Sequence, residues 1–348
     1  MIVLTTVPAE KKEEKKTTSV AEFLKGVVKK YVCGYQARKE EKTKKTLKQA
    51  FVASSFAERR DETELFGEAI DDIMKTPTGR ETMTALSGLG YSFHFDTARD
   101  CAGFCMPGQK KIVINPEFGF GCMLETIVHE GTHAIQKSLE KRNAPDYPDM
   151  KIADMLRCRR AIEADAVAHE MAFVYECKDV LPSVYKNAQE RGLPMFDAYV
   201  DEMEYSGDEK KAMRSAFFAW YECKEYLDGY DKNYKRDARR WSEWAMDQDY
   251  DACFTKDYSA KDVLKMCRYK GKQYMTTDCF LNEGMAFSVS AEDKKEFADM
   301  TRHYAGAVGA KVDTSVMSMR SRSASGRLLP ENNTVNAAFA SKAKQSGR

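Results

Sequence analysis

The sequence predicts an α+β fold that is predominantly helical, with a small sheet beside a metal-binding helix and helical additions at both ends. Three observations predict this class. Most segments repeat apolar residues at helical spacing, whereas the stretch over residues 90–118 alternates as strands do. The third observation is the motif His129-Glu130-Gly131-Thr132-His133, which contains two of the 5 histidines among 348 residues. Chance is a poor explanation for that spacing around a glutamate.

The first elements along the chain are predicted to be helices. We expect residues 1–18 to form a flexible N-terminus and residues 19–60 to form N-terminal helices, because Ser19 and Glu22 make a capping box. A central domain of residues 61–240 then begins with two helices, the second opened by Thr78 with Glu81 and stopped at Gly88 or Gly90. Apolar residues of the first two predicted helices lie at Val20, Phe23, Leu24, Val27, Val28 and Tyr31, and at Leu65, Phe66, Ala69, Ile70 and Ile73.

Strands are predicted immediately before the histidine motif. Residues 90–96 indicate one strand, and residues 101–118 indicate a hairpin that turns at Pro107-Gly108. Ile112, Val113 and Ile114 form the second arm of this hairpin. Their unbroken apolar run fits an interior strand as well as an edge strand.

The histidine motif needs a helix, and its flanks provide one. Apolar residues recur at helical spacing through residues 121–142, at Leu124, Ile127, Val128, Ile135 and Leu139. On that helix His129 and His133 point to the same side and can share a metal ion, with Glu130 beside it. Gly131 is a poor helix former, but the missing β carbon would let another backbone approach closely. A hydrolytic zinc site has three protein ligands and one open position, so a third ligand is required.

The third ligand is expected on the next helix, over residues 150–178. Pro145 and Pro148 separate the two helices and allow them to lie side by side. Glu163 stands among apolar neighbours, where a carboxylate is costly unless it is paired, protonated or bound to a metal. We therefore choose Glu163 as the third ligand. Asp165 and His169 share a different face, and one of them could ligate the metal instead of Glu163. We expect Asp165 to accept the free ring N–H of a ligand histidine, and His169 to bond to the backbone.

These residues resemble a known group of enzymes. His129 to His133, followed after a proline-containing loop by Ile162-Glu-Ala-Asp-Ala166, resemble zincin-type metallopeptidases that take glutamate as third ligand, the gluzincin-like arrangement. The stretches over residues 112–136 and 162–176 are similar to an uncharacterised bacterial metallopeptidase domain family, over about residues 60–240. The resemblance implies that His129, His133 and Glu163 are ligands and Glu130 the general base. Many relatives carry a further acidic residue where this chain has Ala161.

The expected function is zinc-dependent hydrolysis of peptide bonds. A metal-activated water would attack the carbonyl while Glu130 takes its proton. Zincin-type peptidases bind the substrate along an edge strand beside the metal, for which Ile112, Val113 and Ile114 are the candidates. Side chains that could stabilise the oxyanion, with ordinary packing as the alternative for each, are Tyr230, Tyr234, His303 and Tyr304. A noncatalytic zinc-binding interaction or sensor protein, or a helical interaction protein with a coincidental motif, are the other interpretations.

The remaining sequence sets the context of this domain. We expect residues 241–311 to form a helical C-terminal extension and residues 312–348 a disordered basic tail. The net charge of +1 argues against a nucleic-acid partner, so a peptide or protein substrate is the expected partner. The 10 scattered cysteines are expected to be reduced, with Cys101 and Cys105 beside His94 or Cys122 as a weak second metal candidate. The start of the sequence lacks a signal-peptide pattern and no segment suits a membrane, so a cytoplasmic location is expected.

Overall fold

The fold was obtained as a computed structural model. The structure describes residues 20–53, 59–98, 101–140, 147–258, 262, 264–276 and 289–309. The flexible N-terminus expected over residues 1–18, the capping residue Ser19 and the tail expected over residues 312–348 lie outside the described residues. Helices dominate the described chain and a small sheet accompanies them, which confirms the expected balance of secondary structure.

The elements that build the metal-site region follow one another in the order expected from the sequence. The strands are β1 (Phe51–Val52), β2 (Ser92–Phe95), β3 (Gly103–Met106), β4 (Lys111–Ile114), β5 (Arg268–Tyr269) and β6 (Lys272–Gln273). The helices are α1 (Val20–Gln49), α2 (Arg59–Ile73), α3 (Pro77–Ser87), α4 (Phe120–Leu139), α5 (Ile152–Val180), α6 (Pro182–Arg191), α7 (Pro194–Ser206), α8 (Glu209–Glu222), α9 (Lys224–Asp247) and α12 (Ala291–Val308). Helix α3 is capped by Thr76, two residues before the expected Thr78, because the Thr76 side chain accepts the Gly79 N–H.

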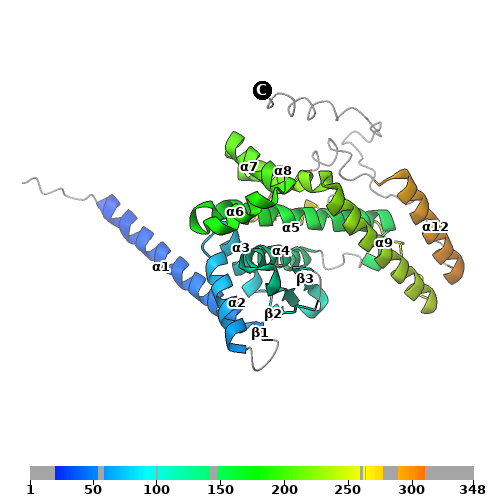
Figure 1. The fold of residues 1–348 in the computed structure, drawn as a ribbon, viewed down its shortest axis with the longest axis horizontal. Coiled ribbons are helices and arrows are strands. Elements are labelled where there is room, and N and C mark those ends of the chain that lie inside the picture. Colours follow the sequence, from blue (N-terminus) through cyan, green and yellow to red (C-terminus); the bar gives the residue numbers. More distant parts are fainter. Residues whose placement is uncertain are drawn as a thin grey trace, which may run out of the picture.

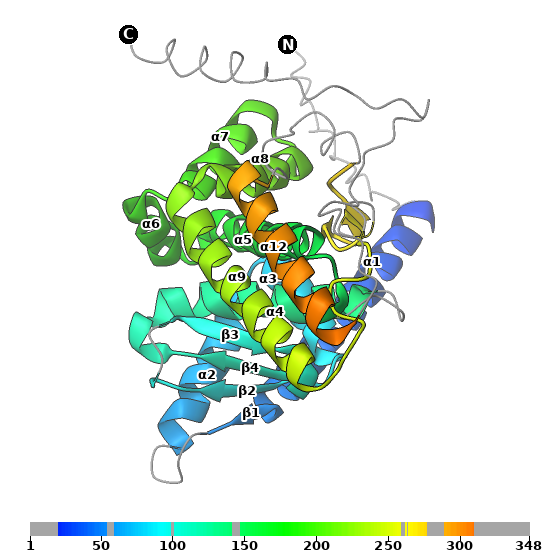
Figure 2. The ribbon, with the colours of Figure 1, turned by 90° about the vertical axis from the view of Figure 1, so that its right-hand side faces the viewer.

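The larger sheet has the strand order β1-β2-β4-β3. Strands β1, β2 and β4 are parallel, and β3 runs antiparallel to β4 (Figure 2). Strand β4 is hydrogen-bonded on both sides, and Ile112, Val113 and Ile114 are buried. These three residues therefore cannot form the expected substrate-binding edge, because their backbone groups are already used within the sheet. The edge next to β4 is β3.

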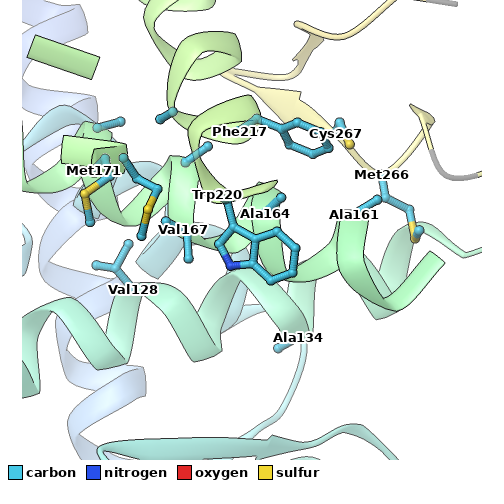
Figure 3. Close-up of a cluster of buried hydrophobic side chains, with 14 of the residues drawn as sticks. Val128, Ala134, Ala161, Ala164, Val167, Met171, Phe217, Trp220, Met266 and Cys267 are labelled. Carbon is cyan, nitrogen blue, oxygen red and sulfur yellow. The ribbon is translucent and has the colours of Figure 1, made fainter. Parts of the chain in front are cut away.

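Helices are layered above this sheet. Figures 1 and 2 show α4 next to the sheet, α5 above α4, and α8 on the far side of α5. Trp220 of α8 packs among small side chains, and Figure 3 shows it beside Ala164 and Val167 of α5 and above Ala134 of α4. Small residues on α5 allow α8 to approach closely, and the buried indole then fixes their separation. This core holds α5 in place behind the metal-binding motif.

Helix α3 packs against α4 at the glycine of the histidine motif. A β carbon on Gly131 would lie 2.7 Å from Leu86 Cδ1 and 3.1 Å from Thr82 Cγ2. Both neighbours belong to α3 and both are buried. Gly131 is therefore required for close packing, and the close approach comes from side chains of α3.

Helix α9 crosses the layers of helices on one side (Figure 2). Its Asp231 pairs with Arg160 of α5, and its Asp237 accepts from Arg159 Nη1 at 2.8 Å. Helix α12 then lies against α9 (Figure 2). Helix α9 runs without a break through residues 240 and 241, where the sequence analysis placed a domain boundary. Within the described ranges, none of the helices is both long and apolar enough to span a membrane.

Candidate metal centre

Three side chains from α4 and α5 converge at one point. The Nε2 atoms of His129 and His133 lie 3.6 and 3.4 Å from Glu163 Oε2. The two rings are nearly perpendicular, with centroids 4.9 Å apart. One donor atom from each residue lies within 4.8 Å of the other two, and each side chain keeps 13–17% of its surface exposed. The expected trio is therefore brought together at a place that solvent can reach.

His129 is oriented by a carboxylate that the sequence analysis did not select. Its Nδ1–H donates to Glu170 Oε2 at 3.0 Å. Glu170 lies seven residues after Glu163 on α5, two turns along the same face, and that spacing was the available signal. Because Nδ1 donates to Glu170, the neutral ring of His129 has its lone pair on Nε2, the atom that faces Glu163.

His133 is oriented through an amide. Its Nδ1–H donates to Gln136 Oε1 at 2.8 Å, and Gln136 Nε2 donates to Asp165 Oδ2 at 2.7 Å and to the Ile162 carbonyl at 2.9 Å. The expectation that Asp165 accepts the N–H of a ligand histidine directly is therefore wrong. Gln136 lies between His133 and Asp165 and hydrogen-bonds to both.

His169 has both ring nitrogens at backbone carbonyls. Nδ1 lies 2.9 Å from the Asp165 oxygen and Nε2 lies 2.8 Å from the Arg268 oxygen. This matches the backbone-bonded role expected for His169. Neither nitrogen is directed at the trio.

The charges of the site are strongly coupled. Burial alone would raise the pKa of Glu163, but the imidazoles of His133 and His129 hold it well below its usual range. Burial would lower the histidine pKa values, but the neighbouring carboxylates raise both, through Glu163 and Glu170 at His129 and mainly through Glu163 at His133. The carboxylates therefore favour positive charge between the three side chains, and a divalent cation would supply it. Two imidazoles and one carboxylate are also a donor set that zinc uses in hydrolytic sites.

The Glu130 side chain extends from α4 towards the edge strand β3, where its Cγ would lie 3.5 Å from a β carbon on Gly103. Burial raises its pKa, and the two histidines and a hydrogen bond from the Cys105 backbone N–H offset part of that rise. The Asn115 N–H donates to the Ala102 carbonyl at 2.8 Å. In an antiparallel ladder the hydrogen-bonded pairs alternate, so Gly103 and Cys105 turn their N–H and C=O groups away from β4. Among the described strands β3 has a free edge, and this edge runs beside Glu130.

Two tyrosines of α9 lie near Glu163. Tyr230 lies close enough to the Glu163 carboxylate that burial, followed by that negative charge, raises the pKa of Tyr230. Tyr234, one turn later, is buried, and its hydroxyl has no hydrogen-bond partner among the described residues. Burial, followed by the Glu163 charge, raises its pKa as well. Both remain candidates for a hydroxyl that acts at the site.

The other two candidates for oxyanion stabilisation have different surroundings. The Tyr304 hydroxyl donates to the Tyr250 carbonyl at 2.6 Å and accepts from the Cys253 N–H at 3.0 Å, so it serves to hold the C-terminal segment. His303 is exposed on α12. Within the described ranges, the side chains grouped closely enough to hold a metal ion are those of His129, His133 and Glu163, and Cys101 and Cys105 do not form such a group with His94 or Cys122.

Comparison with known families agrees with this arrangement. Residues 53–243 match the family described as "Putative metallopeptidase family (DUF6782)". The chain belongs to this metallopeptidase family. The matched segment runs from the end of β1 into α9 and includes the histidine motif, Glu163 and Tyr230. Membership supports a metal-dependent peptidase at that general level, and it confirms the resemblance to an uncharacterised metallopeptidase domain family noted from the sequence. No curated protein and no solved structure matches the chain.

Proposed function

We propose that this protein is a zinc-dependent peptidase, with His129, His133 and Glu163 as ligands and Glu130 as general base. One observation carries the proposal. Both histidines use Nδ1 as a donor to the protein, so both Nε2 lone pairs are left facing a carboxylate from the neighbouring helix. This preorganisation is what a metal with three protein ligands and one open position requires.

The proposed chemistry divides the work between the metal and Glu130. When bound, zinc would supply Lewis-acid polarisation of the substrate carbonyl and lower the pKa of the water it holds to about 7. Glu130 takes a proton from the attacking water and delivers it to the leaving amine nitrogen. Its buried position supports this role, because burial raises the pKa of a carboxylate towards the range where it can accept and release a proton.

Substrate binding is proposed along β3 instead of β4. An extended peptide can add to the free edge, where Gly103 and Cys105 present N–H and C=O groups beside Glu130. Tyr230 is the proposed donor to the oxygen on which negative charge develops, since it is near enough to Glu163 to feel the charge of that carboxylate. Without substrate, the Cys105 N–H satisfies the Glu130 carboxylate.

The proposal is tested first by metal binding. Purified protein should contain about one zinc per chain, and His133→Ala should lose it. His303→Ala is the matched control, because His303 is an exposed histidine outside the site and its loss should leave the zinc content unchanged. Equal zinc content in wild type and His133→Ala would refute the assignment of the ligands.

Hydrolysis is tested separately. Glu130→Gln should keep zinc and lower kcat/KM on a peptide library by at least about 100-fold, the usual contribution of a general base. Glu222→Gln, at an exposed position on α8, is the control. If the wild type binds zinc tightly but cleaves nothing in the library, the noncatalytic zinc-binding interpretation replaces the peptidase.

A further inference from the structure

The segment that follows the family-matched region contacts the metal centre. Tyr274, just after strand β6, is 1% exposed, and its hydroxyl donates to Asp165 Oδ1 at 2.6 Å. The segment is held by two more contacts: Arg214 Nη2 donates to the Tyr274 carbonyl at 2.9 Å, and His169 Nε2 lies 2.8 Å from the Arg268 carbonyl. The matched region ends at residue 243, so Tyr274 lies beyond it.

The donor and the acceptor of each hydrogen bond between Tyr274 and His133 are fixed by the chemistry of the groups. A carboxylate oxygen and a carbonyl oxygen can only accept, so the side-chain atom of Gln136 that faces Asp165 and Ile162 must be its nitrogen. The other side-chain atom is then Oε1, which accepts the Nδ1–H of His133. This places the His133 lone pair on Nε2, 3.4 Å from Glu163 Oε2.

Tyr274 completes this chain at its far end. Asp165 is 1% exposed, and its two oxygens accept from Gln136 and Tyr274. Without the Tyr274 hydroxyl, the buried Asp165 carboxylate would lose one of its two short hydrogen bonds from side chains. The hydrogen bond from the Gln136 amide would remain. The orientation of Gln136, and through it of the His133 ring, would then be less well defined.

We propose that Tyr274 is a positioning residue of the metal centre, which acts on His133 through Asp165 and Gln136 and makes residues 264–276 part of the metal-binding unit. The proposal rests on the proposed function, because it requires His133 to be a ligand. It extends the site beyond the family-matched domain to a segment that sequence comparison does not include.

The experiment is a measurement of zinc affinity in the full chain by competition with a chelator of known affinity. Tyr274→Phe should raise the zinc Kd by about 10-fold, the lower end of the effect seen when a partner of a ligand histidine is removed. Tyr304→Phe is the matched control. Tyr304 is also buried and its hydroxyl also donates over 2.6 Å, but it bonds the Tyr250 carbonyl away from the trio. Its zinc Kd should stay within about twofold of wild type, although urea unfolding should show a loss of stability in both variants.

The outcomes separate this proposal from the proposed function. A Kd for Tyr274→Phe within twofold of wild type, or an equal increase in Tyr304→Phe, overturns the positioning role. If Tyr274→Phe does not fold, Asp165→Asn replaces it in the same assay, and an unchanged Kd there also overturns the proposal. A wild type that binds no zinc overturns the proposed function itself, and the positioning role with it.

Discussion

Replacing Gly103 by alanine should disturb the site through a single added methyl group. A β carbon at Gly103 would lie 2.5 Å from Thr126 Cγ2 on α4 and 2.7 Å from the Val113 carbonyl oxygen on β4. Ordinary van der Waals contact begins at 3.4 Å, so β3 would have to move by about 0.9 Å, the difference between 3.4 and 2.5 Å. Neither neighbour yields easily, because Thr126 is buried and β-branched and the Val113 oxygen belongs to a paired strand.

The expected magnitudes follow from that displacement. Over-packing costs about 1–3 kcal/mol, and the better backbone entropy of alanine returns about 0.5–1 kcal/mol, so Gly103→Ala should lose about 1 kcal/mol of unfolding free energy and at most about 2.5 kcal/mol. A shift of about 1 Å in a substrate-binding strand can lower activity by about 100-fold. We therefore expect kcat/KM to fall by about 10- to 100-fold while zinc content stays unchanged, since the three ligands lie on α4 and α5.

The assays are urea unfolding, zinc analysis and peptide hydrolysis on the same preparations. Gly108→Ala is the matched control, because it lies in the turn of the same hairpin and a β carbon there would meet nothing within 4 Å. It should differ little from wild type in all three assays. A Gly103→Ala variant with wild-type stability and activity would refute the placement of β3 against α4 and its use by substrate.

Three further predictions concern charge and metal. Burial and the Glu170 charge raise the pKa of Glu125 to about 7, and Arg191 offsets part of the rise. Protonated Glu125 therefore stabilises the fold fully below pH 4.5, the ordinary pKa of a glutamate, and this stabilisation is lost as the pH rises through about 7. In metal-free protein, Glu125→Gln should therefore gain stability relative to wild type between pH 5 and pH 8, and parallel urea-unfolding profiles would contradict this. Asp231→Asn should lower the unfolding free energy by about 3 kcal/mol, because it removes the carboxylate paired with the buried Arg160, and a change below about 1 kcal/mol would argue against that pair as an anchor of α9. Adding a chelator should lower the Tm of wild type but not of His133→Ala, and equal shifts would show that the metal binds elsewhere.

Local patterns in the sequence predicted the main parts of the site. The four-residue spacing of His129 and His133 places both rings on one face of any helix, and Glu163 stood out as a carboxylate in an apolar stretch. Both features depend only on helical periodicity and on the cost of burying charge. The structure brings these three residues within reach of one ion.

Nonlocal features could not be predicted in the same way. Whether β4 or β3 is the edge depends on where β2 pairs, and no property of Ile112, Val113 and Ile114 decides that. Gln136 was overlooked because its role needs Asp165 on another helix at the correct distance. Glu170 was overlooked although its spacing from Glu163 was visible.

The sequence by itself determined the helices, the ligand types and their face, because these depend on residues a few positions apart. Only the tertiary structure decided which described strand forms the edge beside Glu130, which tyrosines lie near Glu163, and that Tyr274 reaches Asp165 from outside the matched domain. The physical reason is that hydrogen-bond direction and strand exposure depend on how distant segments pack, and side chains distant in sequence meet only after the chain has folded.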